Sequence, residues 1–111
     1  MSVLTSEGRT RASGDGTRAR WLRVSGTIGG RPAALVIYGH PGNFRAPQPL
    51  RLNPDDPFFC FAPSKLGDWS IAPGQPYVMR YRFAVYDEAP GVPEIERLWN
   101  DYADPPSVKV H

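Results

Sequence analysis

The residues best suited to chemistry lie in one short stretch of the chain. His40, Asn43 and Arg45 place an imidazole, an amide and a guanidinium within six residues, on a segment stiffened by prolines. An imidazole can exchange a proton near neutral pH or bind a metal, and loops on a rigid scaffold often carry functional groups. His40 is therefore the candidate catalytic residue. The alternative, that His40 and Asn43 only satisfy backbone groups of a turn, stays open.

Arginines and aromatic residues supply the candidate ligand-binding groups. Arg80 and Arg82 alternate with aromatic residues, so they would share one face of a strand. Forked guanidinium groups suit carboxylates, phosphates or sugar hydroxyls, although salt bridges to nearby aspartates are an equal alternative. Trp21 offers a flat face for stacking on a sugar ring, but aromatics in a small protein more often belong to the core. The full ligand-binding set is Tyr38, Asn43, Arg45, Arg80, Arg82 and Trp21.

Other catalytic arrangements have little support. The single cysteine, Cys60, excludes an internal disulfide framework and lies among phenylalanines, as a small buried hydrophobe would. Two histidines are too few for a histidine metal cage, so we expect no metal and no cofactor. Adjacent Asp55 and Asp56 would point apart in a strand or turn. The sequence contains no glycine-rich phosphate loop, Gly-x-Ser-x-Gly motif or paired-cysteine zinc pattern.

Short strands must position these groups. Alternating residues in 19–28 predict a half-buried strand, and the apolar run 33–38 predicts a strand covered on both faces. Gly29 and Gly30 suit the tight turn of a hairpin between them. Six prolines between residues 39 and 63 then forbid a helix and predict an ordered, meandering loop. A short aromatic strand, 58–62, would end it.

The second half of the chain shows the clearest periodicities. A possible strand at 68–71 and a turn at 72–75 precede a strand at 77–86, whose aromatic face we expect to be core and whose arginine face would meet water or a site. Pro93 to Tyr102 predicts an amphipathic helix. Its apolar stripe recurs at positions i, i+3, i+4 and i+7.

Composition limits the class of protein. The 111 residues leave room for one domain, and a net charge of +2 is no nucleic-acid footprint. The longest apolar run is far too short to span a membrane, and no signal peptide precedes it, so we expect a cytoplasmic location without membrane or nucleic-acid partners. We expect a mainly β fold with one C-terminal amphipathic helix. The expected organisation is a basic, extended or mobile N-terminal arm at 1–18, a β domain at 19–106 and a tail at 107–111.

A series of short motifs runs through most of the chain. These are Ser6-Glu7-Gly8, Gly16-Thr17-Arg18-Ala19-Arg20-Trp21, Val24-Ser25-Gly26, His40-Pro41-Gly42-Asn43-Phe44-Arg45, Pro47-Gln48-Pro49, Phe59-Cys60-Phe61-Ala62-Pro63 and Arg80-Tyr81-Arg82-Phe83. In this order they resemble the C-terminal part of the bacterial DUF6807 family, whose members often carry the label methane oxygenase PmoA. The family usually has Asp before His-Pro, where this chain has Gly39, so a carboxylate–histidine pair is missing at that place.

The resemblance implies an antiparallel β-sandwich, part of a galactose-mutarotase-like supersandwich. Members are usually longer, so it also implies a fragment, a truncated product or a minimal form, with open sheet edges that a homo-oligomer or another chain would cover. By fold analogy we expect binding of a carbohydrate or similar polar ligand. One alternative is an enzyme, either an oxygenase as labelled or a carbohydrate lyase, hydrolase or epimerase using His40. Another is a structural module that completes a larger sandwich.

Overall fold

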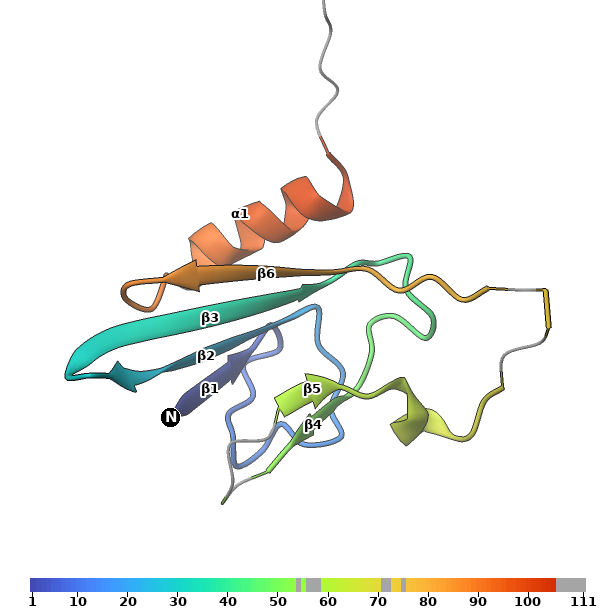
Figure 1. The fold of residues 1–111 in the computed structure, drawn as a ribbon, viewed down its shortest axis with the longest axis horizontal. Coiled ribbons are helices and arrows are strands. Elements are labelled where there is room, and N and C mark those ends of the chain that lie inside the picture. Colours follow the sequence, from blue (N-terminus) through green and yellow to red (C-terminus); the bar gives the residue numbers. More distant parts are fainter. Residues whose placement is uncertain (54, 56–58, 71–72, 75, 106–111) are drawn as a thin grey trace, which may run out of the picture.

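The protein is mainly β. The computed structural model describes residues 1–53, 55, 59–70, 73–74 and 76–105. Its elements, in chain order, are β1 (Ser2–Thr5), β2 (Trp21–Ile28), β3 (Arg31–Gly39), β4 (Leu50–Leu52), β5 (Phe59–Phe61), the 3-10 turn η1 (Pro63–Leu66), β6 (Tyr81–Tyr86) and α1 (Val92–Ala103). Four strands form an antiparallel sheet in the order β1-β2-β3-β6, and β4 and β5 form a separate ribbon (Figure 1). The predicted mainly β, antiparallel class with one C-terminal helix is confirmed.

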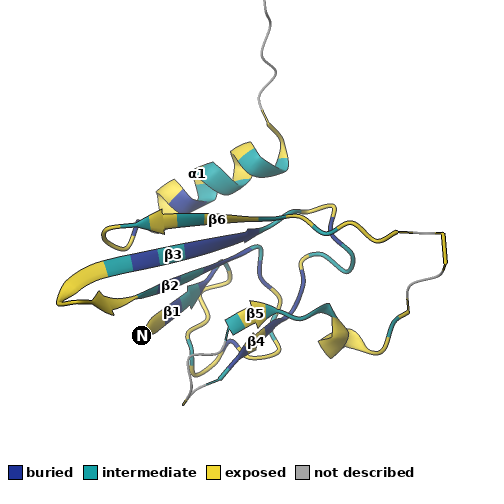
Figure 2. Cartoon of the chain, in the orientation of Figure 1, coloured by how far each residue is buried: buried dark blue, intermediate teal, exposed yellow. Residues whose placement is uncertain are grey.

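The predicted hairpin is present as β2 and β3, and it forms the centre of the sheet. Trp21 pairs with Tyr38 at its open end, and Ile28 pairs with Arg31 at the turn. Gly29 and Gly30 have φ of 57° and 79°, the positive values that such a turn requires. The strand β3 is covered on both faces along its second half (Figure 2).

Two apolar clusters lie on opposite faces of this sheet. On one face, Leu22, Val24 and Ile37 pack against Leu50 and Leu52 of β4. On the other, α1 covers the sheet, and the cluster there consists of Trp21, Val36, Tyr38 and Ile95, with Leu98, Trp99 and Tyr102 packed against it. The predicted helix 93–102 is therefore confirmed together with its apolar stripe, and the β4–β5 ribbon forms a small second layer opposite it.

Residues 1–18 are not a free arm. Val3 pairs with Val24, and Val3 and Thr5 are both buried. An isolated bridge joins Arg18 to Pro49, which ties the end of this segment to the start of β4. The sequence predicts an extended or mobile arm here; Ser2–Thr5 are extended, as β1, and pairing with β2 holds them in the sheet. This pairing needs only a few buried side chains, too few to stand out in the sequence.

The strand β6 is shorter than predicted and its faces are reversed. It begins at Tyr81, and its aromatic face is largely open to solvent, with Phe83 64% and Val85 80% exposed. Ala84 and Tyr86, on the arginine-bearing face, pack against the cluster beneath α1. The physical reason is that α1 folds back over the Ala84 face, whereas the small β4–β5 ribbon leaves Phe83 and Val85 uncovered.

Several smaller predictions also differ from the structure. Cys60 is exposed rather than buried, since it points away from the core on the short strand β5. Residues 68–70 form no strand. Phe58, Ile71, the ends of the turn 72–75, Asp56 and the tail 107–111 lie outside the described residues. Gly74, within that turn, has a positive φ of 77°.

Candidate functional site

The loop after β3 is held by the residue that precedes β6. The side chain of Asn43 donates from Nδ2 to the carbonyl of Arg80 at 2.8 Å, and the amide of Arg80 donates to Oδ1 of Asn43 at 2.7 Å. The amide of His40 also donates to the same carbonyl at 3.2 Å. Asn43 is buried, and both of its polar atoms are used within the chain. It therefore shapes the loop rather than offering free groups to a ligand.

Arg45 braces the same loop from the other side. Its guanidinium donates to the carbonyls of Pro63, Gly67 and Asp68 at 3.0, 2.6 and 3.1 Å. The residue adopts a φ of 57°, a left-handed conformation that costs energy for a non-glycine residue. The three hydrogen bonds offset that cost, so Arg45 joins two loops and does not face the other candidate site residues.

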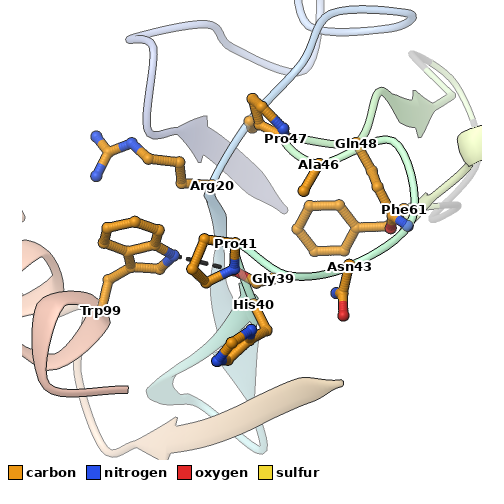
Figure 3. Close-up of a pocket in the computed structure, with 11 residues that line it drawn as sticks. Arg20, Gly39, His40, Pro41, Asn43, Ala46, Pro47, Gln48, Phe61 and Trp99 are labelled. Carbon is orange, nitrogen blue, oxygen red and sulfur yellow. Dashed lines mark hydrogen bonds between the residues drawn. The ribbon is translucent and has the colours of Figure 1, made fainter. Parts of the chain in front are cut away.

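A cavity of about 160 Å³ lies between this loop, β5 and α1. We call it the Trp99 cavity, and its lining residues are Ala19, Arg20, Gly39, His40, Pro41, Asn43, Ala46, Pro47, Gln48, Phe61 and Trp99 (Figure 3). In Figure 3, Trp99 and Phe61 stand on opposite sides of Pro41, and Ala46 and Pro47 lie on the Phe61 side. The peptide between Ala46 and Pro47 is cis. The walls are thus mostly apolar.

Hydrogen bonds from α1 hold the Trp99 wall in place. The indole Nε1 of Trp99 donates to the carbonyl of Gly39 at 3.0 Å. One turn earlier, Glu96 accepts two hydrogen bonds of 2.6 Å from Arg20 and one of 3.1 Å from Nε1 of Trp21. The hydrogen bonds from Arg20 lower the pKa of Glu96, against the opposing effect of burial, so the carboxylate is ionised at neutral pH. These contacts fix the helix at the edge of the cavity.

The polar atoms around the cavity are mostly satisfied within the chain. Gln48 donates from Nε2 to the carbonyl of Phe44 at 2.7 Å and accepts from the hydroxyl of Tyr81. His40 accepts the amide proton of Gly42 on Nδ1 at 3.0 Å, so a neutral imidazole carries its proton on Nε2. No described residue bonds to that Nε2. It is the polar atom most available to a ligand here.

A basic rim borders the cavity beside His40. We use this name for His40, Arg80, Arg82 and Tyr102. The ring of His40 meets that of Tyr102 edge-on at 5.2 Å between centroids, and the guanidinium of Arg82 lies 4.7 Å from the Tyr102 centroid. Burial raises the pKa of Tyr102, and the positive charges of Arg82 and Arg80 partly oppose that rise. Arg80 and Arg82 are both exposed, and within the described residues neither forms an ion pair.

The structure thus brings together His40, Arg80 and Arg82, as the sequence suggested, and buries the two aromatic candidates. Trp21 and Tyr38 are each only 1% exposed, so neither can stack on a ligand. The hydroxyl of Tyr38 lies near Tyr86 without reaching hydrogen-bond geometry, and burial raises the pKa of Tyr38.

Sequence reasoning missed three groups of the site. Trp99 and Tyr102 were assigned to the apolar stripe of the predicted helix, and Phe61 to the short aromatic strand 58–62. Arg20 was placed in the predicted strand 19–28 without a role at a site. A possible signal was the excess of aromatic residues on that stripe, since two adjacent turns carry Trp99 and Tyr102 where aliphatic residues would serve a core.

Two features are absent among the described residues, a cluster of metal ligands and a helix able to span a membrane. No three His, Cys, Asp or Glu side chains among these residues gather as metal ligands would. Within the same part of the chain, no helix has the length and apolar character needed to cross a membrane.

Comparison with known proteins gives one match. The model of a family of unknown function, DUF6807, matches residues 1–100. No curated protein and no solved structure matches the chain significantly.

Proposed function

The chain belongs to the DUF6807 family of unknown function, and from that premise we propose that it binds a carbohydrate, or a ligand of similar polarity, where the Trp99 cavity meets the basic rim. A sugar ring has apolar C–H faces and a polar edge. Binding sites for such ligands combine apolar walls with a few placed polar groups. The observation that carries the proposal is that His40 lies in both places, lining the cavity and touching Tyr102 of the rim.

The size of the cavity limits what enters it. At about 160 Å³ it is smaller than the roughly 300–1,000 Å³ of sites that enclose a whole drug-sized ligand. One ring or substituent would enter between Trp99 and Phe61. The rest of the ligand would lie outside, against the exposed guanidinium groups of Arg80 and Arg82.

The charge of the rim favours acidic sugars over neutral ones. Arg80 and Arg82 present two cations without a carboxylate partner among the described residues. Arginine binds carboxylates through paired, charge-assisted hydrogen bonds. A uronic acid would therefore bind more tightly than the hexose from which it differs only in its carboxylate.

Isothermal titration calorimetry on the full chain tests the proposal. Glucuronate and galacturonate are compared with glucose and galactose, and acetate reports the effect of charge alone. We expect both uronates to bind more tightly than their neutral counterparts and than acetate, and Arg82→Gln to remove the difference. The absence of heat with every sugar at millimolar concentration would overturn the proposal.

A second candidate is acid–base catalysis on the same class of ligand by His40. The favouring observation is that Nδ1 accepts from Gly42, which leaves the Nε2 proton available for transfer. Incubation with uronate-containing oligosaccharides, followed by detection of new reducing ends, would reveal lyase or hydrolase turnover. If His40→Ala binds the oligosaccharide and still turns it over at the original rate, this role is ruled out.

A further inference from the structure

The two edges of the four-stranded sheet differ. The outer edge of β1 is covered by its own chain, since Leu4 forms a bridge with Thr10 and the amide of Thr5 donates to the carbonyl of Arg9 at 2.9 Å. The strand β6 is the other edge, and it pairs only with β3. No described residue forms a backbone hydrogen bond to its outer side.

The register identifies which groups of β6 point outward. The carbonyl of Arg80 bonds toward β3, at the amide of His40. Since backbone groups along a strand alternate in direction, those of residues 82, 84 and 86 also point toward β3. The amides and carbonyls of Tyr81, Phe83 and Val85 therefore point away from the sheet. These groups are available to another strand.

The strand has few of the devices that protect an edge. It has no proline, glycine, lysine or bulge over Tyr81–Tyr86, and Arg82 is its one charged residue. Its face opposite α1 carries Phe83 and Val85, which are 64% and 80% exposed. An exposed apolar edge of this kind is expected to pair with another strand.

The charges around β6 are self-complementary. Arg80 and Arg82 lie at its start, and Asp87 and Glu88 follow its end. All four are exposed, and none forms an ion pair within the described residues. Antiparallel pairing of two identical strands brings the basic start of each to the acidic end of the other, whereas parallel pairing would place like charges together.

We propose that β6 pairs antiparallel with β6 of a second copy of this chain, with Phe83 opposite Val85 of that copy and Arg80 opposite its Glu88. The two four-stranded sheets then form one continuous sheet. Shifting one strand by one residue would place Phe83 opposite Ala84 or Tyr86 of the second copy. Their backbone groups point toward β3, so they cannot bond with those of Phe83. The alternative that sets Phe83 opposite itself would leave Arg80 opposite Tyr86, without its charge partner. This inference does not depend on the proposed ligand.

Light scattering coupled to size-exclusion chromatography tests the pairing on the full chain. We expect a mass approaching twice 12.3 kDa as the concentration rises, because a contact of one strand pair is smaller than a typical stable interface. A monomer at every concentration from about 1 µM to about 1 mM would overturn the proposal. A chain that stays monomeric alone but pairs through β6 with a strand of a different polypeptide would also contradict self-pairing.

Charge reversal tests the register. Arg80→Glu alone and Glu88→Arg alone should each weaken the dimer at least tenfold, and the double variant should restore it, because each two-fold pairing contains the contact twice. Arg97→Glu, on an exposed part of α1, makes the same charge change away from β6 and should leave the dimer intact. A double variant that stays as weak as the single ones would contradict this register. Circular dichroism would show that each variant is folded.

Discussion

The guanidinium of Arg20 donates two hydrogen bonds of 2.6 Å to the carboxylate of Glu96, which lies 76 residues later in the chain. The indole of the neighbouring Trp21 donates a third hydrogen bond to the same carboxylate. Each of the two charged side chains is 30% exposed. Arg20 also lies 5.0 Å from the centroid of the Trp99 ring. This pair therefore joins α1 to the start of β2 beside the wall that closes the Trp99 cavity.

Replacing Glu96 with Gln should lower the free energy of unfolding by about 1–2 kcal/mol at pH 7, since a charge-assisted pair is lost in a partly exposed place. The pKa of Glu96 is lowered in the folded state, so its contribution is complete above its ordinary value of 4.5 and is lost as the pH falls below that value. Urea unfolding from pH 7 to pH 3 should therefore show the gap between wild type and Glu96→Gln closing in acid. Asp101→Asn, which breaks an exposed pair of 3.7 Å with Arg97, is the control and should have almost no effect. A gap that widens in acid would contradict the assignment.

Replacing Asn43 with Ala should lower the free energy of unfolding by about 1–3 kcal/mol, because the partly buried amide and carbonyl of Arg80 each lose the hydrogen bond to the buried Asn43 side chain. Chemical denaturation measures the change. Asn100→Ala removes the same side chain from an exposed position of α1 and should cost nothing. Equal stability of the two variants would show that Asn43 does not hold the loop.

Replacing Gly14 with Ala should destabilise the fold by about 1–3 kcal/mol through overpacking. A Cβ there would lie 2.7 Å from Cδ1 of Leu52 and 2.9 Å from the backbone carbonyl oxygen of Thr10, which has little freedom to move. Gly26→Ala is the matched control, because its Cβ would meet its first neighbour, Cα of Met1, only at 3.9 Å. Thermal unfolding followed by circular dichroism should show a clearly lower midpoint for Gly14→Ala alone.

Replacing Ala46 with Leu should fill part of the Trp99 cavity and weaken uronate binding about tenfold, or roughly 1.4 kcal/mol, while the protein stays folded. Calorimetric titration measures the affinity. Ala89→Leu, at an exposed position away from the cavity, is the control. If Ala46→Leu binds as the wild type does while Arg82→Gln still weakens binding, the ligand contacts the basic rim without entering the cavity.

Local patterns in the sequence were enough for the elements with strong internal periodicity. The hairpin of β2 and β3 follows from two β-type runs around Gly29 and Gly30, and α1 follows from its apolar stripe. His40, Arg80 and Arg82 were also identified as candidates that belong together. For the hairpin and the helix, the decisive interactions lie within a few residues or along one strand. The pairing of β3 with β6 is what brings His40 next to Arg80.

Tertiary structure decided which side of each element became the inside. Periodicity showed that β6 has an apolar and an arginine-bearing face, but α1 packs on the second one and leaves Phe83 exposed. In the same way, the hydrogen bond to the carbonyl of Gly39 placed Trp99 at the cavity, whereas Trp21 was buried beneath α1, where it donates to Glu96. A sequence pattern specifies two faces of an element. The burial of either face depends on a segment distant in the chain, and no local signal records that packing.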